Sequence, residues 1–163
     1  YRQAHNGASP TELFVHGKTR FSIDEWEGFR DTVPENCKVA CVQIREDLSL
    51  KLFRPGDTNV ARCLGWVETP SKGYLWTKGF IPRLQTYPGR EVPNPLSIEV
   101  VRGEADIKIV MSDVLALTKL NYNTCIFSDG VPVTLRFADT IGEILTAGPI
   151  RDDLPPLPFR YYI

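Results

Sequence analysis

The order of strand-like and helix-like segments constrains the fold of this chain most strongly. Segments with alternating polarity and many Val and Ile residues predict strands over residues 12–16, 38–45, 61–68, 73–78 and 96–101, with residues 48–53 continuing in the same style. Capping signals predict helices over about 22–32 and 112–120, and helical spacing of apolar residues predicts a helix over about 132–145. Because strands dominate the first part and helices the second, we predict the α/β class with a central mixed sheet.

Local signals predict where these helices and the ends of the chain lie. Ser22 and Glu25 form a capping-box pattern, Ser112 can cap the second helix, and Pro132 can begin the third. Residues 1–6 resemble the tail of a helix that stops at Asn6 and Gly7, so we expect the chain to start inside a fold. The proline-rich residues 154–163 predict an extended arm.

Composition limits the class of protein. With 163 residues, 42% of them hydrophobic, the chain fits one domain or a large piece of one. Its apolar runs are far shorter than the roughly 20 residues of a membrane helix, and no signal segment opens it. The cysteines form no CxxC pair and no metal-ligand spacing with a histidine, so we expect buried, reduced thiols in a cytoplasmic protein. They are Cys37, Cys41, Cys63 and Cys125.

A basic and aromatic stripe stands out in a chain whose net charge is only -1. Residues 69–90 contain no acidic residue, and their cations are Lys72, Lys78, Arg83 and Arg90. Cations in such a row suit a nucleic-acid backbone, although a solvated charged face is the alternative. Tyr74 and Trp76 alternate along a strand, so we expect them to fill the core on one face of the sheet.

Several segments carry a resemblance to a known family. LALTKLNYNTCIFSDGVPVTLRFADTIGEIL (residues 115–145), with the ending PPLPFRYYI, resembles the C-terminal part of Argonaute PIWI domains, and within them the short prokaryotic type. ELFVHGKTRF (residues 12–21) resembles the segment around one family active-site position, and residues 74–96 resemble a strand and loop of the nucleic-acid channel. The resemblance implies that residues 1–163 are the C-terminal part of a PIWI domain. It also implies an RNase H-like mixed sheet flanked by helices and incomplete at its N-terminal side.

The resemblance also bears on catalysis. Active members hold two divalent cations with three carboxylates and a fourth Asp or His. Here His16 stands where active members have the Asp of Arg-Asp-Gly, and Asp139 falls on the fourth position. We therefore expect no cleavage and treat His16 and Asp139 as remnant positions, with Asp139 pairing with Arg136 on its own helix. The alternative is a metal-dependent nuclease that uses Asp139 and acids outside this chain, with His16 as a further ligand.

Binding residues are implied in two further places. By resemblance, the turn with Lys119, Asn121 and Asn123, together with Arg136, approaches guide phosphates near the 5' end; the alternative for both asparagines is helix capping. In the tail, Arg160 and Tyr161 precede the α-carboxylate of Ile163. The resemblance implies that this carboxylate helps to coordinate Mg²⁺ with the guide's 5' phosphate. The alternative is a tail that only packs on the sheet.

The resemblance implies a function in prokaryotic defence. The expected activity is binding of a guide RNA and recognition of single-stranded DNA from plasmids or phage, with base pairing supplying the specificity. The implied partner is an effector with an APAZ region fused to a TIR or sirtuin-like domain. Besides a nuclease, the remaining alternative is a structural scaffold that binds no nucleic acid.

Overall fold

A mixed sheet forms the centre of the computed structural model, which describes residues 6–87, 91–120 and 130–147. Within these residues, five strands lie in the order β1-β2-β5-β4-β3. The strands are β1 (Glu12–Gly17), β2 (Lys38–Glu46), β3 (Leu64–Thr69), β4 (Lys72–Trp76) and β5 (Leu96–Arg102). Strands β1 and β2 are parallel, and the other neighbouring pairs are antiparallel. The predicted α/β class with a mixed sheet is confirmed.

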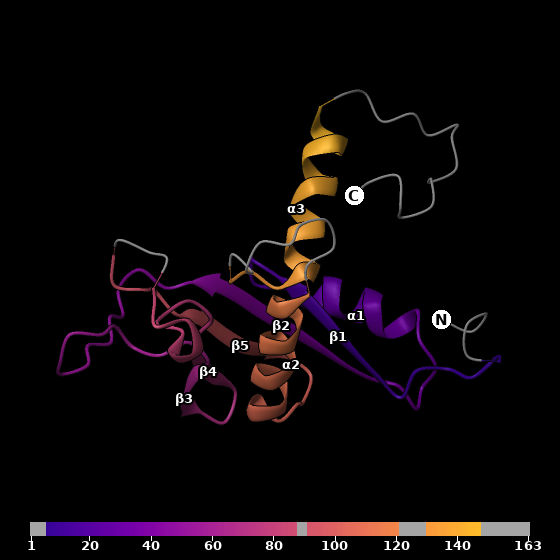
Figure 1. Ribbon diagram of the computed structural model, residues 1–163. Coiled ribbons are helices and arrows are strands. Elements are labelled where there is room, and N and C mark those ends of the chain that lie inside the picture. Colours follow the sequence, from indigo (N-terminus) through magenta and orange to yellow (C-terminus); the bar gives the residue numbers. More distant parts are fainter. Residues whose placement is uncertain (1–5, 88–90, 121–129, 148–163) are drawn as a thin grey trace.

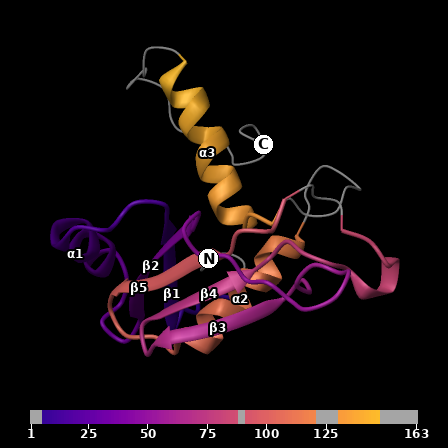
Figure 2. The ribbon, with the colours of Figure 1, turned by 90° about the vertical axis from the view of Figure 1, so that its left-hand side faces the viewer.

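Helices cover the sheet and extend from it. They are α1 (Ile23–Asp31), α2 (Ile107–Lys119) and α3 (Val133–Thr146), with a short 3-10 helix, η1 (Pro82–Leu84). Helix α2 lies along the sheet, α1 lies beside β2, and α3 projects beyond one end of the sheet (Figures 1 and 2). Both ends of the predicted capping box are present at α1, because Ser22 and Glu25 each bond the other's backbone N–H.

The main core lies between the sheet and α2. Val42 and Ile44 of β2 and Ile98 of β5 are fully buried there, and they pack with Val110 and Val114 of α2. Residues two apart on a strand share a face, so the alternation in β2 places its other side chains on the face that carries α1. On that second face the indole N–H of Trp26 points at the carbonyl of Val39, 3.5 Å away.

Helix α2 approaches the β3–β4 hairpin closely because glycines face it. A Cβ atom at Gly73 would lie 2.5 Å from the sulfur of Met111 and 3.0 Å from the carbonyl oxygen of Trp66. A Cβ atom at Gly65 would also meet Met111, at 2.9 Å. These two positions leave the space that the Met111 side chain fills, so they set the distance between helix and hairpin.

Aromatic side chains fill the other face of the hairpin. Tyr74 and Trp76 are buried with Val60, which confirms the prediction that they belong to the core. Trp66 stacks on Tyr74 with ring centroids 5.4 Å apart and remains about half exposed. The hairpin itself was also predicted, and its loop is Pro70 and Ser71 between β3 and β4.

The prediction that residues 48–53 continue as a strand is wrong. The Asp47 carboxylate accepts hydrogen bonds from the backbone and hydroxyl of Ser49, at 2.9 and 2.6 Å, and from the Leu50 backbone at 3.3 Å. An Asp side chain that bonds the backbone two and three residues ahead turns the chain. The chain therefore leaves the sheet at this turn, although its composition favours a strand.

The predicted start of the second helix is also wrong. Helix α2 begins at Ile107, and its N-cap is Asp106, whose side chain accepts from the Lys108 backbone at 2.8 Å. The predicted cap, Ser112, lies inside the helix instead. The apolar side chains that contact the sheet begin in the first turn, at Ile107, so tertiary packing starts the helix well before the predicted residue.

The third strand and its cysteine differ from expectation as well. Strand β3 begins at Leu64 rather than at residue 61, because Cys63 has a left-handed φ of 72° that interrupts the extended run. Cys37 and Cys41 are buried free thiols as predicted, but Cys63 is exposed, so that part of the prediction is wrong. Cys125 lies outside the described residues.

Candidate nucleic-acid interface

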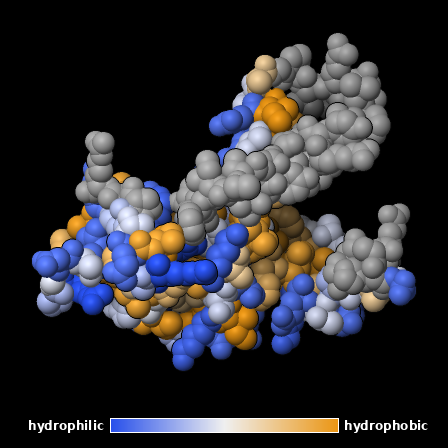
Figure 3. Space-filling view, viewed as in Figure 1, coloured by the Kyte–Doolittle hydropathy of each residue, from blue (hydrophilic) through white to orange (hydrophobic). Residues whose placement is uncertain are grey.

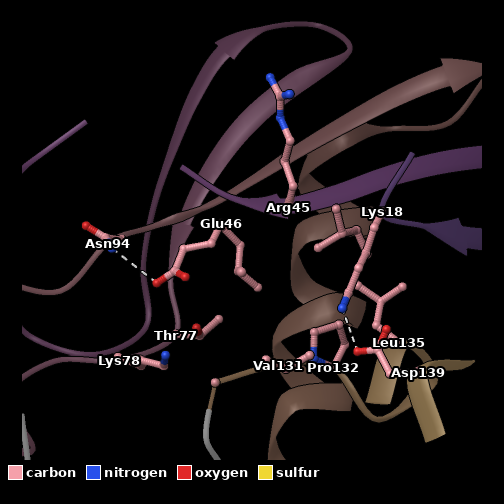
Figure 4. Close-up of a pocket in the computed structure, with 13 residues that line it drawn as sticks. Lys18, Arg45, Glu46, Thr77, Lys78, Asn94, Val131, Pro132, Leu135 and Asp139 are labelled. Carbon is pink, nitrogen blue, oxygen red and sulfur yellow. Dashed lines mark hydrogen bonds and ion pairs between the residues drawn. The ribbon is translucent and has the colours of Figure 1, made fainter. Parts of the chain in front are cut away.

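A pocket lies where the carboxyl ends of β1 and β2 meet the start of α3. It has a volume of about 310 Å³. Its polar lining residues are Lys18, Arg45, Glu46, Thr77, Lys78, Asn94 and Asp139. Lys18 and Asp139 lie on one side of the pocket, and Glu46, Thr77, Lys78 and Asn94 lie on the other (Figure 4). The Arg45 side chain extends away from the Lys18–Asp139 pair in the same view, so it supplies no charge between the two sides.

An ion pair connects the end of β1 with α3 on one side of the pocket. The ammonium of Lys18, which directly follows β1, lies 2.5 Å from the carboxylate Oδ2 of Asp139 on α3. The side-chain amide of Gln43 donates to the Lys18 carbonyl at 3.0 Å and holds its backbone against β2. We predicted that Asp139 pairs with Arg136 on its own helix, and the structure instead pairs it with Lys18. The first turns of α3 meet the end of β1, so the fold brings together residues 121 positions apart.

Polar groups on the opposite side are linked to one another. The amide of Asn94 donates to the Glu46 carboxylate at 3.2 Å, and Lys51 donates to the Asn94 side-chain oxygen. Lys78 is exposed at the end of this wall, directly after Thr77. A Cβ atom at Gly130, where φ is 85°, would lie 2.8 Å from the Lys78 side chain, so the absence of a side chain there leaves room for the lysine stem.

His16 is anchored beside the pocket. Its Nδ1 lies 2.9 Å from the hydroxyl oxygen of Thr134 in the first turn of α3, and the two share a hydrogen bond. Burial lowers the pKa of the imidazole below its usual range, and the negative charge of Asp113 on α2 opposes this in part. The position that we compared with the family's aspartate is therefore a partly buried imidazole that bridges β1 and α3.

The other predicted cations of the described ranges do not line this pocket. Arg83 is exposed in η1, and Lys119 is exposed at the last position of α2. Arg136 is partly buried on α3, which contacts α2. Of the predicted residues, Lys78 and Asp139 line the pocket, and Arg83, Lys119 and Arg136 do not. The face that carries α2 mixes hydrophobic and hydrophilic side chains (Figure 3).

Lys72 of the basic stripe is held within the β3–β4 hairpin. Its ammonium lies 2.8 Å from the Glu68 carboxylate and 5.0 Å from the centre of the Tyr74 ring. The hydrogen bond to Glu68 and the contact with Tyr74 both raise the pKa of this lysine. Its charge is therefore already paired at the hairpin, away from the pocket.

Several predicted binding residues cannot be placed in this geometry. Those that lie outside the described residues are Arg90, Asn121, Asn123, Arg160, Tyr161 and Ile163. The predicted extended arm at residues 154–163 lies outside them too, as do residues 1–5 of the predicted helix tail.

Solved structures share this arrangement of sheet and helices. Clostridium butyricum Argonaute, bound to a guide DNA and a 19-mer target DNA, matches with a TM-score of 0.65 and 21% identity over 86% of this chain. Aa-Ago with externally bound siRNA matches with a TM-score of 0.64 and 16% identity over 90% of this chain. The chain has the RNase H-like fold of Argonaute PIWI domains. It spans 18% and 20% of those two Argonautes. No protein-family model matches the sequence, and no curated protein does.

The two-metal chemistry of an active RNase H-like site does not fit the described residues. The Asp139 carboxylate faces the Lys18 ammonium, whose positive charge opposes a divalent cation at the same oxygen. In the part of the chain that the structure describes, no group of three or more His, Cys, Asp and Glu residues could hold a metal.

The sequence analysis did not identify Lys18, the residue that pairs with Asp139. Lys18 follows the strand-end motif directly, but no sequence spacing links it to Asp139, since only the fold brings them together. Glu46 and Asn94 were missed for the same reason. A lysine directly after a strand whose carboxyl end faces a helix start is the one signal that could have pointed to Lys18.

No helix in the described ranges has the length and apolar character needed to cross a membrane.

Proposed function

We propose that this chain is the C-terminal part of a PIWI domain that takes part in guided recognition of single-stranded nucleic acid without cutting it. The observation that supports this most is the pocket at the carboxyl ends of β1 and β2, which presents Lys18 and Lys78 within the Argonaute fold. Phosphodiester groups are bound by such lysines and by amides at a helix start, and α3 begins at this pocket.

The proposal that the site does not cut rests on the groups that surround Asp139. An imidazole occupies the position compared with a family aspartate, and a lysine neutralises the remaining carboxylate. A pocket that offers ammonium groups instead of paired metals can hold a phosphate but cannot activate a water in the way that two divalent cations do.

Further parts of the proposal rest on the resemblance to short Argonautes. We place the protein in the cytoplasm, with an RNA guide, a single-stranded DNA target and a role in defence against plasmids or phage. An APAZ-containing effector with a TIR or sirtuin-like domain is the proposed partner. Mg²⁺ held by the Ile163 carboxylate at the guide's 5' phosphate belongs to the same proposal, as do contacts from Asn121, Asn123 and Arg160.

Binding by the complete protein, loaded with a guide, tests the main proposal. We expect the change Lys78→Ala to weaken binding of a labelled complementary DNA strand and to lower the slope of log K against log salt by about 0.7 to 0.9. Lys108→Ala is the matched control, because Lys108 is an exposed lysine at the first turn of α2 and does not line the pocket.

Cleavage is measured in the same assay. No cut is expected in Mg²⁺ or Mn²⁺, and a metal-dependent cut that is lost in Asp139→Asn would establish the nuclease instead. Binding that Lys78→Ala and Lys108→Ala leave equally unchanged, at every salt concentration, would contradict the role of the pocket.

A further inference from the structure

The Lys18–Asp139 pair belongs to the lining of the pocket at the start of α3. The lysine side chain is 54% exposed and the aspartate side chain 47% exposed, so both groups face solvent. An exposed ion pair of this kind contributes little to stability, and its partners can be rearranged at small cost. The pair is therefore available to a ligand rather than sealed within the core.

The backbone on both sides of this pair is fixed. Gln43 holds the Lys18 carbonyl against β2, and the His16–Thr134 hydrogen bond ties the end of β1 to the first turn of α3. The ammonium therefore projects from backbone that hydrogen bonds hold on both sides, although its own side chain is exposed. A charged donor on backbone that is held in this way loses less conformational freedom when it binds a ligand.

An ammonium group can donate hydrogen bonds to Asp139 and to a phosphate at the same time. It has three N–H donors, and one of them directed at Asp139 leaves two for another acceptor. A phosphodiester oxygen accepts such charge-assisted bonds. Asp139 would then hold the lysine in place, in the way that an acidic ligand holds a metal ion, while the lysine contacts the phosphate.

From this geometry we infer that Lys18 is the cation of the pocket that contacts nucleic acid: paired with Asp139, it binds a backbone phosphate of the target strand. This inference rests on the proposed function and names the residue that contacts the strand. Lys78 supplies a second ammonium on the opposite wall, so the strand would pass between the two lysines (Figure 4).

Four variants of the complete, guide-loaded protein test the inference by binding of a labelled DNA strand across a range of salt. Lys18→Ala and Lys18→Gln are expected to weaken binding about threefold to tenfold and to lower the salt slope by about 0.7 to 0.9. Lys18→Arg is expected to keep the slope. Asp139→Asn keeps a side-chain oxygen that can accept from Lys18 but removes the negative charge that repels a phosphate, so we expect binding that is unchanged or tighter.

These outcomes separate the inference from its alternatives. A purely structural ion pair predicts a similar small loss of melting temperature for Lys18→Ala and Asp139→Asn, with no change in the salt slope. A metal ligand at Asp139 predicts that Asp139→Asn weakens binding and abolishes a Mn²⁺ signal detected by electron paramagnetic resonance. Either result would overturn the inference.

The wild-type protein distinguishes this failure from a failure of the proposed function. If wild-type protein binds the strand but Lys18→Ala behaves like the control Lys108→Ala, only the role of Lys18 is overturned. If wild-type protein binds no single strand at any salt concentration, the proposed function and the inference fall together.

Discussion

At the scale of single residues, the imidazole of His16 and the ammonium of Lys18 distinguish this site from a cluster of acidic metal ligands. His16 is bound to Thr134, and burial keeps its pKa low, so the ring is neutral at physiological pH. The ammonium of Lys18 lies 2.5 Å from the Asp139 carboxylate. Of the two groups, only the ammonium favours an anion over a divalent cation at Asp139, because a neutral imidazole can itself bind a metal.

Titration of His16 makes stability depend on pH. Its pKa in the folded protein lies below the unfolded value, so the unfolded state binds the proton more readily. We expect the contribution of His16 to the free energy of unfolding to be constant above about pH 6.5. Below that pH this contribution is expected to fall, by no more than about 1.4 kcal/mol per pH unit. Urea unfolding of the complete protein between about pH 7.5 and 5.5 measures this.

The variant His16→Asn supplies the comparison. For each protein, the free energy of unfolding at each pH is compared with its value at about pH 7.5. The part of the decrease at low pH that is due to His16 is expected to be absent in the variant. An identical decline in wild-type protein and His16→Asn would show that burial does not hold this imidazole neutral.

At the scale of elements, the contact between α2 and the β3–β4 hairpin depends on the absence of side chains. Gly65 and Gly73 face Met111, and β4 continues from this contact to Thr77 and Lys78 at the pocket. The distance of α2 from the hairpin therefore helps to position one wall of the site. Helix α3 supplies the other wall through its first turns, where Leu135 is buried.

Two glycines test this packing. Gly73→Ala places a methyl group against Met111 and the Trp66 carbonyl, so we expect a loss of about 1 to 3 kcal/mol in the free energy of unfolding. Gly28→Ala is the matched control, because an added Cβ atom there meets nothing within 4 Å and α1 gains helix propensity, which stabilises it by about 0.5 to 1 kcal/mol. Denaturant unfolding measures both, and a neutral Gly73→Ala would show that Met111 yields without cost.

At the scale of the whole molecule, one core connects the sheet to both walls of the pocket. Ile44 of β2 and Leu96 of β5 belong to this core and also line the pocket, as does Leu135 of α3. Loss of core packing is therefore expected to affect the site and the fold together, since the same side chains support both.

Replacement of a central core residue tests this connection. Ile98 is fully buried in β5, and Ile98→Ala is expected to cost about 2 to 5 kcal/mol of stability. Ile109 on α2 is 56% exposed, so Ile109→Ala should change stability by less than about 0.5 kcal/mol. Equal losses in thermal or denaturant unfolding would mean that the core does not lie between α2 and the sheet.

The sequence by itself determined the mixed α/β class, most of the strands, the capping box of α1 and the start of α3. These features depend on local periodicity and capping, which neighbouring residues carry. Tertiary packing decided the early start of α2, because apolar contacts with the sheet extend that helix. It also decided the partner of Asp139, because charges 121 positions apart meet only after β1 and α3 have docked, and no local pattern encodes that distance.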